Sequence, residues 1–168
     1  MATIAVITVV NDEGGEISKE KSCGACVFFE TTVRLELEEL ARKENINIVI
    51  WNQQNFGVKN MHEKVPDVLR KTSAWYPKFV YFDAASWKKV SADKKADVPF
   101  DLYNGEKDEK GGWKLRSRPM IAKSIVAWAV EKLAGKAPGK VAPAGKADPL
   151  DEILVVGSRW QASKRQKK

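Results

Sequence analysis

Two cysteines separated by two residues are the part of this sequence whose residue types and spacing most directly indicate chemistry. Cys23 and Cys26 are the only cysteines among 168 residues. At this spacing two sulfurs reach each other across one helical turn, so they can form and break a disulfide. A structural zinc site needs four Cys or His ligands, which this chain cannot supply because His62 is its single histidine. The pair therefore indicates thiol–disulfide exchange, and we expect no metal and no cofactor.

The residues after the pair predict an amphipathic helix that runs to Lys43. Charged residues separate apolar ones that recur at helical spacing: Val27, Phe28, Val33, Leu37, Leu40 and Ala41. A cysteine at a helix N-terminus lies beside unpaired backbone N–H groups, which stabilise the thiolate that attacks a disulfide. We therefore expect Cys23 to be more reactive than Cys26.

Three segments rich in β-branched and aromatic residues predict strands that position this helix. They are Thr3 to Val10, Ile46 to Trp51 and Lys78 to Asp83. The first is apolar almost throughout, which predicts burial on both faces, and the polar stretch Asn11 to Lys21 after it predicts a loop. A strand, helix and strand with short connections imply a right-handed crossover and a parallel pair.

The remaining elements carry weaker signals. Met61 to Thr72 predicts a helix with Pro66 in its first turn. Pro119 opens a helix from Met120 to Ala134, which has one apolar stripe: Ile121, Ile125, Trp128, Ala129 and Leu133. The region from Trp87 to Gly112 is polar and contains Asn104-Gly105 and Gly111-Gly112, which indicate a hairpin or a long insertion. Trp113 to Arg116 suits a short edge strand.

This order of elements resembles the thioredoxin superfamily over roughly residues 3 to 134. The resemblance implies an α/β fold with a central mixed sheet flanked by helices. It also implies that Cys23 is the nucleophile, that Cys26 resolves the mixed disulfide, and that Pro77 is a cis-proline beside them. Tyr76 and Pro77 would then hold the substrate chain.

The sequence departs from the family's pattern around the cysteines. Ser22 precedes the first cysteine, where thioredoxins usually have Trp, and Ala25 precedes the second, where they usually have Pro. Because these neighbours tune the redox potential in the family, the sequence leaves the direction of exchange open. Glu16 lies near the position of the family's buried acid, but its surroundings are too polar to predict burial.

A basic tail follows the predicted domain, which we place at residues 1–134. Residues 135–168 contain eight Lys or Arg against three acidic residues, so they hold five of the chain's seven net positive charges. The Lys, Ala, Pro and Gly residues from 136 to 149 are typical of a linker. The nearly neutral domain, in which aromatic and basic residues do not interleave, argues against a specific nucleic-acid site.

The end of the tail predicts protein binding. Its large apolar side chains are not expected to stay in water, and we expect them to dock on a sheet edge or groove, on this domain or a neighbouring subunit: Ile153, Leu154, Val155, Val156 and Trp160. The sequence shows neither a membrane span nor a secretory signal, so we expect a protein that is not secreted. It would lie in the cytoplasm or in a virion or other large assembly.

Two functions remain open at this point. The intact pair favours a thiol–disulfide oxidoreductase that is anchored by its tail. The atypical Ser22 and Ala25 and the adhesive tail favour a non-catalytic assembly component, such as a minor capsid or scaffold protein that uses a thioredoxin-like fold. The linker is similar in composition to those in structural proteins of large DNA viruses.

Overall fold

The computed structural model describes residues 1–52, 65–72 and 75–135. The chain divides into two compact units, Met1–Ser117 and Arg118–Lys168, and each is described by itself. The first unit combines helices with a mixed sheet, which confirms the α/β class. The boundary that we expect between residues 134 and 135 lies where the described residues end, so it stays a prediction.

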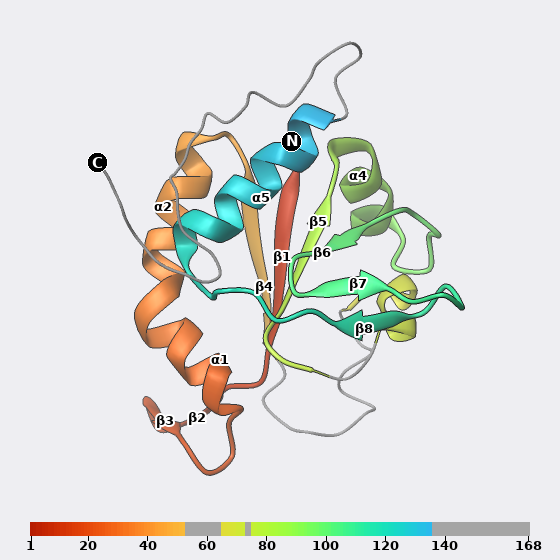
Figure 1. Ribbon diagram of the computed structural model, residues 1–168. Helices are drawn as coiled ribbons and strands as arrows, with labels where there is room; N and C mark the ends of the chain where they lie inside the picture. Colours follow the sequence, from red (N-terminus) through yellow and green to blue (C-terminus); the bar gives the residue numbers. More distant parts are fainter. Residues whose placement is uncertain (53–64, 73–74, 136–168) are drawn as a thin grey trace. The chain divides into compact units, whose positions relative to one another are not determined.

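The sheet of the first unit has the strand order β4-β1-β5-β6 (Figure 1). Its strands are β1 (Thr3–Thr8), β4 (Asn47–Asn52), β5 (Lys78–Phe82) and β6 (Asp101–Leu102). Strand β1 pairs in parallel with β4 and antiparallel with β5, as the strand–helix–strand pattern predicts for the first pair. All six residues of β1 are buried, which confirms the expected central strand.

The cysteines are followed by one helical run in three parts: α1 (Gly24–Phe28), the π-helical η1 (Phe29–Val33) and α2 (Arg34–Lys43). The Thr31 hydroxyl donates to the Val27 carbonyl at 2.9 Å, which gives that carbonyl a partner where the regular ladder changes. The buried side chains of the run form one stripe: Cys26, Phe29, Val33, Leu37 and Ala41. The expectation for Phe28 was wrong, since this side chain is 49% exposed.

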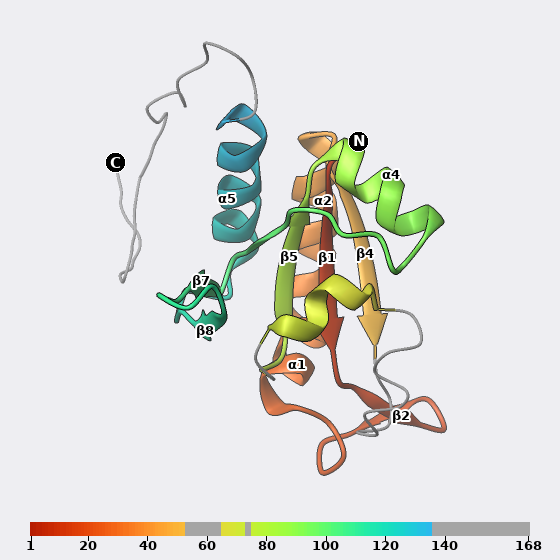
Figure 2. The same ribbon diagram turned by 90° about the vertical axis from the view of Figure 1, so that its right-hand side faces the viewer.

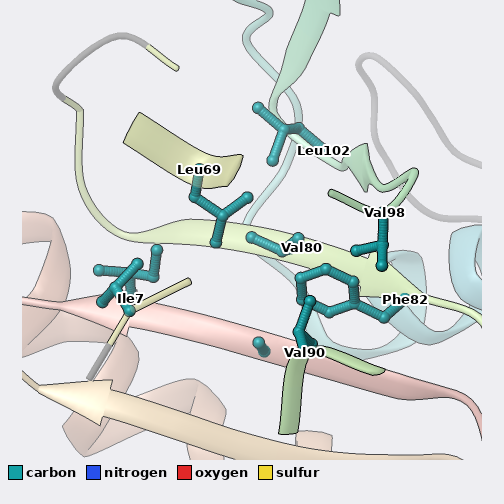
Figure 3. Packing of buried hydrophobic residues seen from close by; sticks show 9 residues of the cluster. Ile7, Leu69, Val80, Phe82, Val90, Val98 and Leu102 are labelled. Carbon is teal, nitrogen blue, oxygen red and sulfur yellow. The ribbon is translucent and has the colours of Figure 1, made fainter. Parts of the chain in front are cut away.

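Two layers cover the faces of the sheet (Figure 2). On one face lies the helical run, where the Phe29 and Phe79 rings meet edge to face with centroids 5.6 Å apart. The other face is covered by η2 (Asp67–Lys71), a 3₁₀ helix, and α4 (Ala84–Ala92). Figure 3 shows the apolar cluster on this side, formed by Ala5, Ile7, Val65, Leu69, Val80, Phe82, Val90, Val98 and Leu102.

The stretch that we expect to be a loop after β1 contains a small hairpin instead. Strands β2 (Asn11–Glu13) and β3 (Glu16–Ser18) pair across Gly14 and Gly15. Both glycines have positive φ, at 65° and 91°, which other residues rarely adopt. Gly14 and Gly15 therefore form the turn of this hairpin.

Helix α4 was missed in the polar region after β5. The Asp83 carboxylate accepts the Ser86 N–H at 2.8 Å and caps the helix, and Val90 is buried. The expected hairpin is present further on, where β7 (Gly105–Lys107) pairs with β8 (Trp113–Leu115). Its turn lies between Lys107 and Trp113 and contains Gly111, whose φ is 82°, so the Gly111-Gly112 pair marks it and Asn104-Gly105 does not.

Two expected helices differ in extent from the prediction. Pro66 caps the five-residue η2, and residues 61–64 of the expected helix lie outside the described part. In the second unit α5 spans Ala122–Gly135, because the Ile125 N–H donates to the Ile121 carbonyl and the helix begins after Ile121. Of its expected stripe, Ile121 and Leu133 are exposed.

Candidate thiol site

Cys23 occupies the N-cap of α1, as the sequence predicts. Its backbone is extended, with φ −67° and ψ 126°, and its Sγ accepts the Cys26 N–H at 3.3 Å. An N-cap side chain normally satisfies one of the helix's unpaired N–H groups, and here a sulfur does so. The Cys23 N–H donates to the Val9 carbonyl at 2.9 Å, which ties the helix start to the end of β1.

Cys26 lies one turn further on and is fully buried, whereas Cys23 is half-buried. The Val9 N–H donates to the Cys26 Sγ at 3.4 Å. Burial raises the pKa of the Cys26 thiol far above its usual range. The neighbouring Cys23 adds to this rise in pKa, and the Val9 N–H opposes it. Cys26 therefore keeps its proton at neutral pH, and only Cys23 is open to solvent.

The segment before β5 meets Cys23 although it lies far along the chain. The Cys23 Sγ donates to the Tyr76 carbonyl oxygen at 3.4 Å, and the Tyr76–Pro77 peptide is cis, as the resemblance implies. Burial raises the pKa of the Tyr76 hydroxyl, and the nearby sulfurs of Cys26 and Cys23 add to the rise. The structure thus brings together Cys23, Cys26 and Tyr76; that Tyr76 and Pro77 bind substrate stays a prediction.

Asn104 fixes the Tyr76–Pro77 segment and was missed as a site residue. Its Nδ2 donates to the Pro77 carbonyl at 2.8 Å, and its Oδ1 accepts the Phe79 N–H at 3.4 Å. The carboxamide thus bridges two backbone groups at the start of β5. The only sequence signal at this position was the Asn104-Gly105 pair, which we interpreted as a turn.

Lys78 is a second residue that sequence reasoning missed. It begins β5 directly after Pro77 and is 5% exposed. Its ammonium group donates to the Thr72 hydroxyl and lies 5.0 Å from the centroid of the Trp75 ring. Burial lowers the pKa of Lys78 to about 8. Lys78 therefore connects Thr72 and Trp75, which precede Tyr76 in the chain, to the start of β5, which follows it.

The residues that depart from the thioredoxin pattern have ordinary structural roles. The Ser22 hydroxyl accepts the Asn11 N–H at 2.8 Å and connects the cysteine loop to β2. Ala25 is exposed on the first turn of α1, and Glu16 is exposed in β3. Glu16 is thus unsuited to act as a buried proton acceptor.

The described residues bear on two further expectations. They contain no cluster of three or more Cys, His, Asp and Glu residues that could hold a metal ion. None of the helices in the described ranges has the length and hydropathy that crossing a bilayer requires. His62 and the apolar residues Ile153 to Val156 and Trp160 lie outside the described residues.

Comparison with protein-family models, with curated proteins and with solved structures gives no match. The fold and the site therefore define the protein only as a class: a mixed α/β protein with a cysteine pair at a helix start, apposed to a cis-proline segment. Membership of the thioredoxin superfamily stays a prediction.

Proposed function

We propose that the chain is a thioredoxin-like thiol–disulfide oxidoreductase that reacts through Cys23. The observation that carries the proposal is the asymmetry of the pair. Cys23 has a half-buried sulfur that accepts a backbone N–H at 3.3 Å, and Cys26 is fully buried one turn away. A sulfur that attacks must be accessible and have a stabilised thiolate, and a sulfur that resolves must be adjacent.

The first step forms a mixed disulfide. The Cys23 thiolate attacks one sulfur of a substrate disulfide, a new S–S bond forms, and the substrate's own S–S bond breaks. The electron pair of the broken bond leaves on the second substrate sulfur, which takes a proton from solvent. The Cys26 N–H supports the thiolate before the attack.

The second step regenerates a free substrate and oxidises the pair. The Cys26 sulfur attacks the Cys23 Sγ, and the mixed disulfide breaks. The Cys26 proton passes to the departing substrate sulfur, directly or through water, so the substrate leaves as a thiol. The substrate gains two electrons, and Cys23 and Cys26 form a disulfide. A dithiol reductant must then return two electrons to the protein, and with an oxidised protein the same steps run in reverse.

The order of the elements supports a thioredoxin-like architecture. A strand, the cysteine pair at a helix start, a parallel strand, and a strand entered through Tyr76–Pro77 follow each other as the resemblance implies. On this proposal the Tyr76–Pro77 segment holds the substrate chain beside Cys23. The substrates would be disulfides of protein partners, met in the cytoplasm or within the assembly to which the tail binds.

The test is dithiothreitol-driven reduction of a protein disulfide by the full chain. We expect activity in the wild type and none above background in Cys23→Ser. Reduced Cys26→Ser, mixed with the substrate after the dithiothreitol is removed, should accumulate a mixed disulfide because its second step is absent. The matched control is Ser22→Ala, which keeps both thiols and should stay active. A wild type no faster than Cys23→Ser would overturn the proposal and leave the non-catalytic assembly component as the remaining hypothesis.

A further inference from the structure

Strand β4 forms one edge of the four-stranded sheet and has β1 as its single pairing partner among the described strands (Figures 1 and 2). Its sequence, Asn-Ile-Val-Ile-Trp-Asn from Asn47 to Asn52, contains no charge, proline or glycine. Proteins usually protect a long edge strand with charged residues, proline, a bulge or a covering element. The opposite edge, β6, is two residues long and begins with Asp101. The edge of β4 thus lacks the features that prevent pairing with another strand, whereas β6 is short and carries a charge.

The hydrogen bonds of β4 show which backbone groups face this open edge. The Asn47 N–H donates to the Ala2 carbonyl at 2.9 Å, so the backbone N–H and C=O groups of Asn47 face β1. In a parallel pair, successive residues direct their N–H and C=O groups alternately to the two sides. Val49 and Trp51 therefore also bond to β1, whereas the backbone groups of Ile48, Ile50 and Asn52 face the open edge.

A second β4 strand fits this edge about a two-fold axis. Antiparallel strands related by such an axis pair residues that point to the same face, so the two residue numbers of each pair sum to an even number. A register centred on Ile50 places Ile50 opposite Ile50 and Ile48 opposite Asn52, and all of these residues have outward backbone groups. Val49 then lies opposite Trp51 as an apolar pair, and no charges meet.

We propose that β4 is a homodimerisation edge at which two copies of this chain join their sheets antiparallel, with Ile50 at the two-fold axis. The inference is independent of the thiol function. The chain's own tail is the competing occupant, but Asp151 and Glu152 directly precede its apolar run from Ile153 to Val156, and Gly157 follows it. A second β4 offers six residues without charge or glycine and is therefore the better partner for the whole edge.

Amide hydrogen exchange on the full chain tests the pairing residue by residue. We expect the amides of Val49 and Trp51 to be protected at every concentration, since they bond to β1. Protection of the Ile48 and Ile50 amides should rise with concentration. Because the monomer fraction of a dimer falls with the square root of concentration, their exchange should slow by about tenfold between about 10 µM and about 1 mM.

A variant at the two-fold position supplies the second measurement. Ile50→Pro removes an N–H that faces the edge and leaves the bonds to β1 in place. Sedimentation should give a dimer mass for the wild type and for the matched control Ile50→Val, and a monomer mass for Ile50→Pro. Protection of Ile48 and Ile50 that is independent of concentration would mean that the chain's own tail covers the edge. That result would overturn the proposal, as would a monomeric wild type with both amides unprotected at about 1 mM.

Discussion

The two layers on the sheet of the first unit bury similar kinds of side chain but differ in what else they hold. The helical run from Gly24 to Lys43 carries Cys26 inside its buried stripe, next to Phe29. The layer of η2 and α4 holds a cluster of apolar and aromatic residues, with Phe82 near the rings of Trp87 and Phe100 at 5.8 and 6.4 Å. The helical face thus carries both sulfurs, whereas the other face carries no thiol and meets the site where Trp75 and Tyr76 pack against its cluster.

The largest expected effect is on the helical face, where one substitution should abolish disulfide exchange without lowering the stability of the fold. Cys23→Ser should reduce disulfide exchange to the uncatalysed rate, because a serine hydroxyl is not ionised at neutral pH. The free energy of unfolding should stay unchanged or rise by up to about 1 kcal/mol, since serine is a favoured N-cap residue. Exchange kinetics and denaturant unfolding measure the two quantities. Exchange that survives in this variant would remove Cys23 from the mechanism.

The second prediction concerns the face covered by η2 and α4, where a substitution should change stability and leave the thiol chemistry unchanged. Phe82→Ala should lower the free energy of unfolding by about 3–5 kcal/mol, because it empties a fully buried ring position. The alkylation rate of Cys23 should not change under conditions where the variant is folded. Leu115→Ala is the control, since Leu115 is 58% exposed and should change the unfolding free energy by less than about 0.5 kcal/mol. A Cys23 rate that follows Phe82 would show that the two layers are coupled.

The third prediction concerns the pH dependence that Lys78 adds. Its pKa of about 8 in the folded chain is lower than the value near 10.5 of a free lysine, so between these pH values the unfolded chain binds more protons. Lys78 therefore destabilises the fold below about pH 8, and this cost disappears as the pH rises toward 10.5. Lys78→Met should be more stable relative to wild type at pH 7 than at pH 10.5, by up to about 3 kcal/mol.

Chemical denaturation of both proteins across this pH range measures that difference. Other groups that titrate nearby, such as Tyr81, whose pKa burial raises to about 12, are present in both proteins and cancel. A difference that is independent of pH would contradict the lowered pKa of Lys78.

The smallest expected effect is at Asn104, next to the cis-proline segment. Asn104→Ala should cost about 2 kcal/mol of unfolding free energy, because the Pro77 carbonyl and the Phe79 N–H lose their amide partner. It should also speed alkylation of Cys23 by roughly twofold, since the Tyr76 carbonyl that accepts its proton is held less firmly. Asn104→Asp keeps the acceptor for Phe79 but not the donor for Pro77, and should lie between alanine and wild type. A change in stability without any change in alkylation would limit Asn104 to a structural role.

The sequence predicted the features that depend on local pattern. β1 was predicted because all of its residues suit burial, and Cys23 was placed at a helix start because apolar residues recur at helical spacing after it. The contact between Cys23 and Tyr76 joins residues 53 positions apart, so only the family resemblance indicated it.

Some missed features depend on backbone groups. Phe29, by contrast, lies four residues before Val33 and belongs to the same helical stripe as Leu37 and Ala41, so the sequence prediction was wrong in choosing Phe28 in its place. Val9 reaches both cysteines through its N–H and C=O, which a side-chain pattern cannot show. Helix α4 was missed because its cap, Asp83, follows the strand without a break.

The hydrogen bond from Cys23 to the Tyr76 carbonyl makes that carbonyl a spectroscopic reporter. When Cys23 is a thiol, its S–H donates to this oxygen at an S–O distance of 3.4 Å; in a Cys23–Cys26 disulfide the sulfur has no proton to donate. A ¹³C label in the Tyr76 carbonyl should therefore show one infrared band in the reduced protein and another in the oxidised protein. The oxidation state of the purified, site-specifically labelled protein could then be followed without any reagent that reacts with thiols.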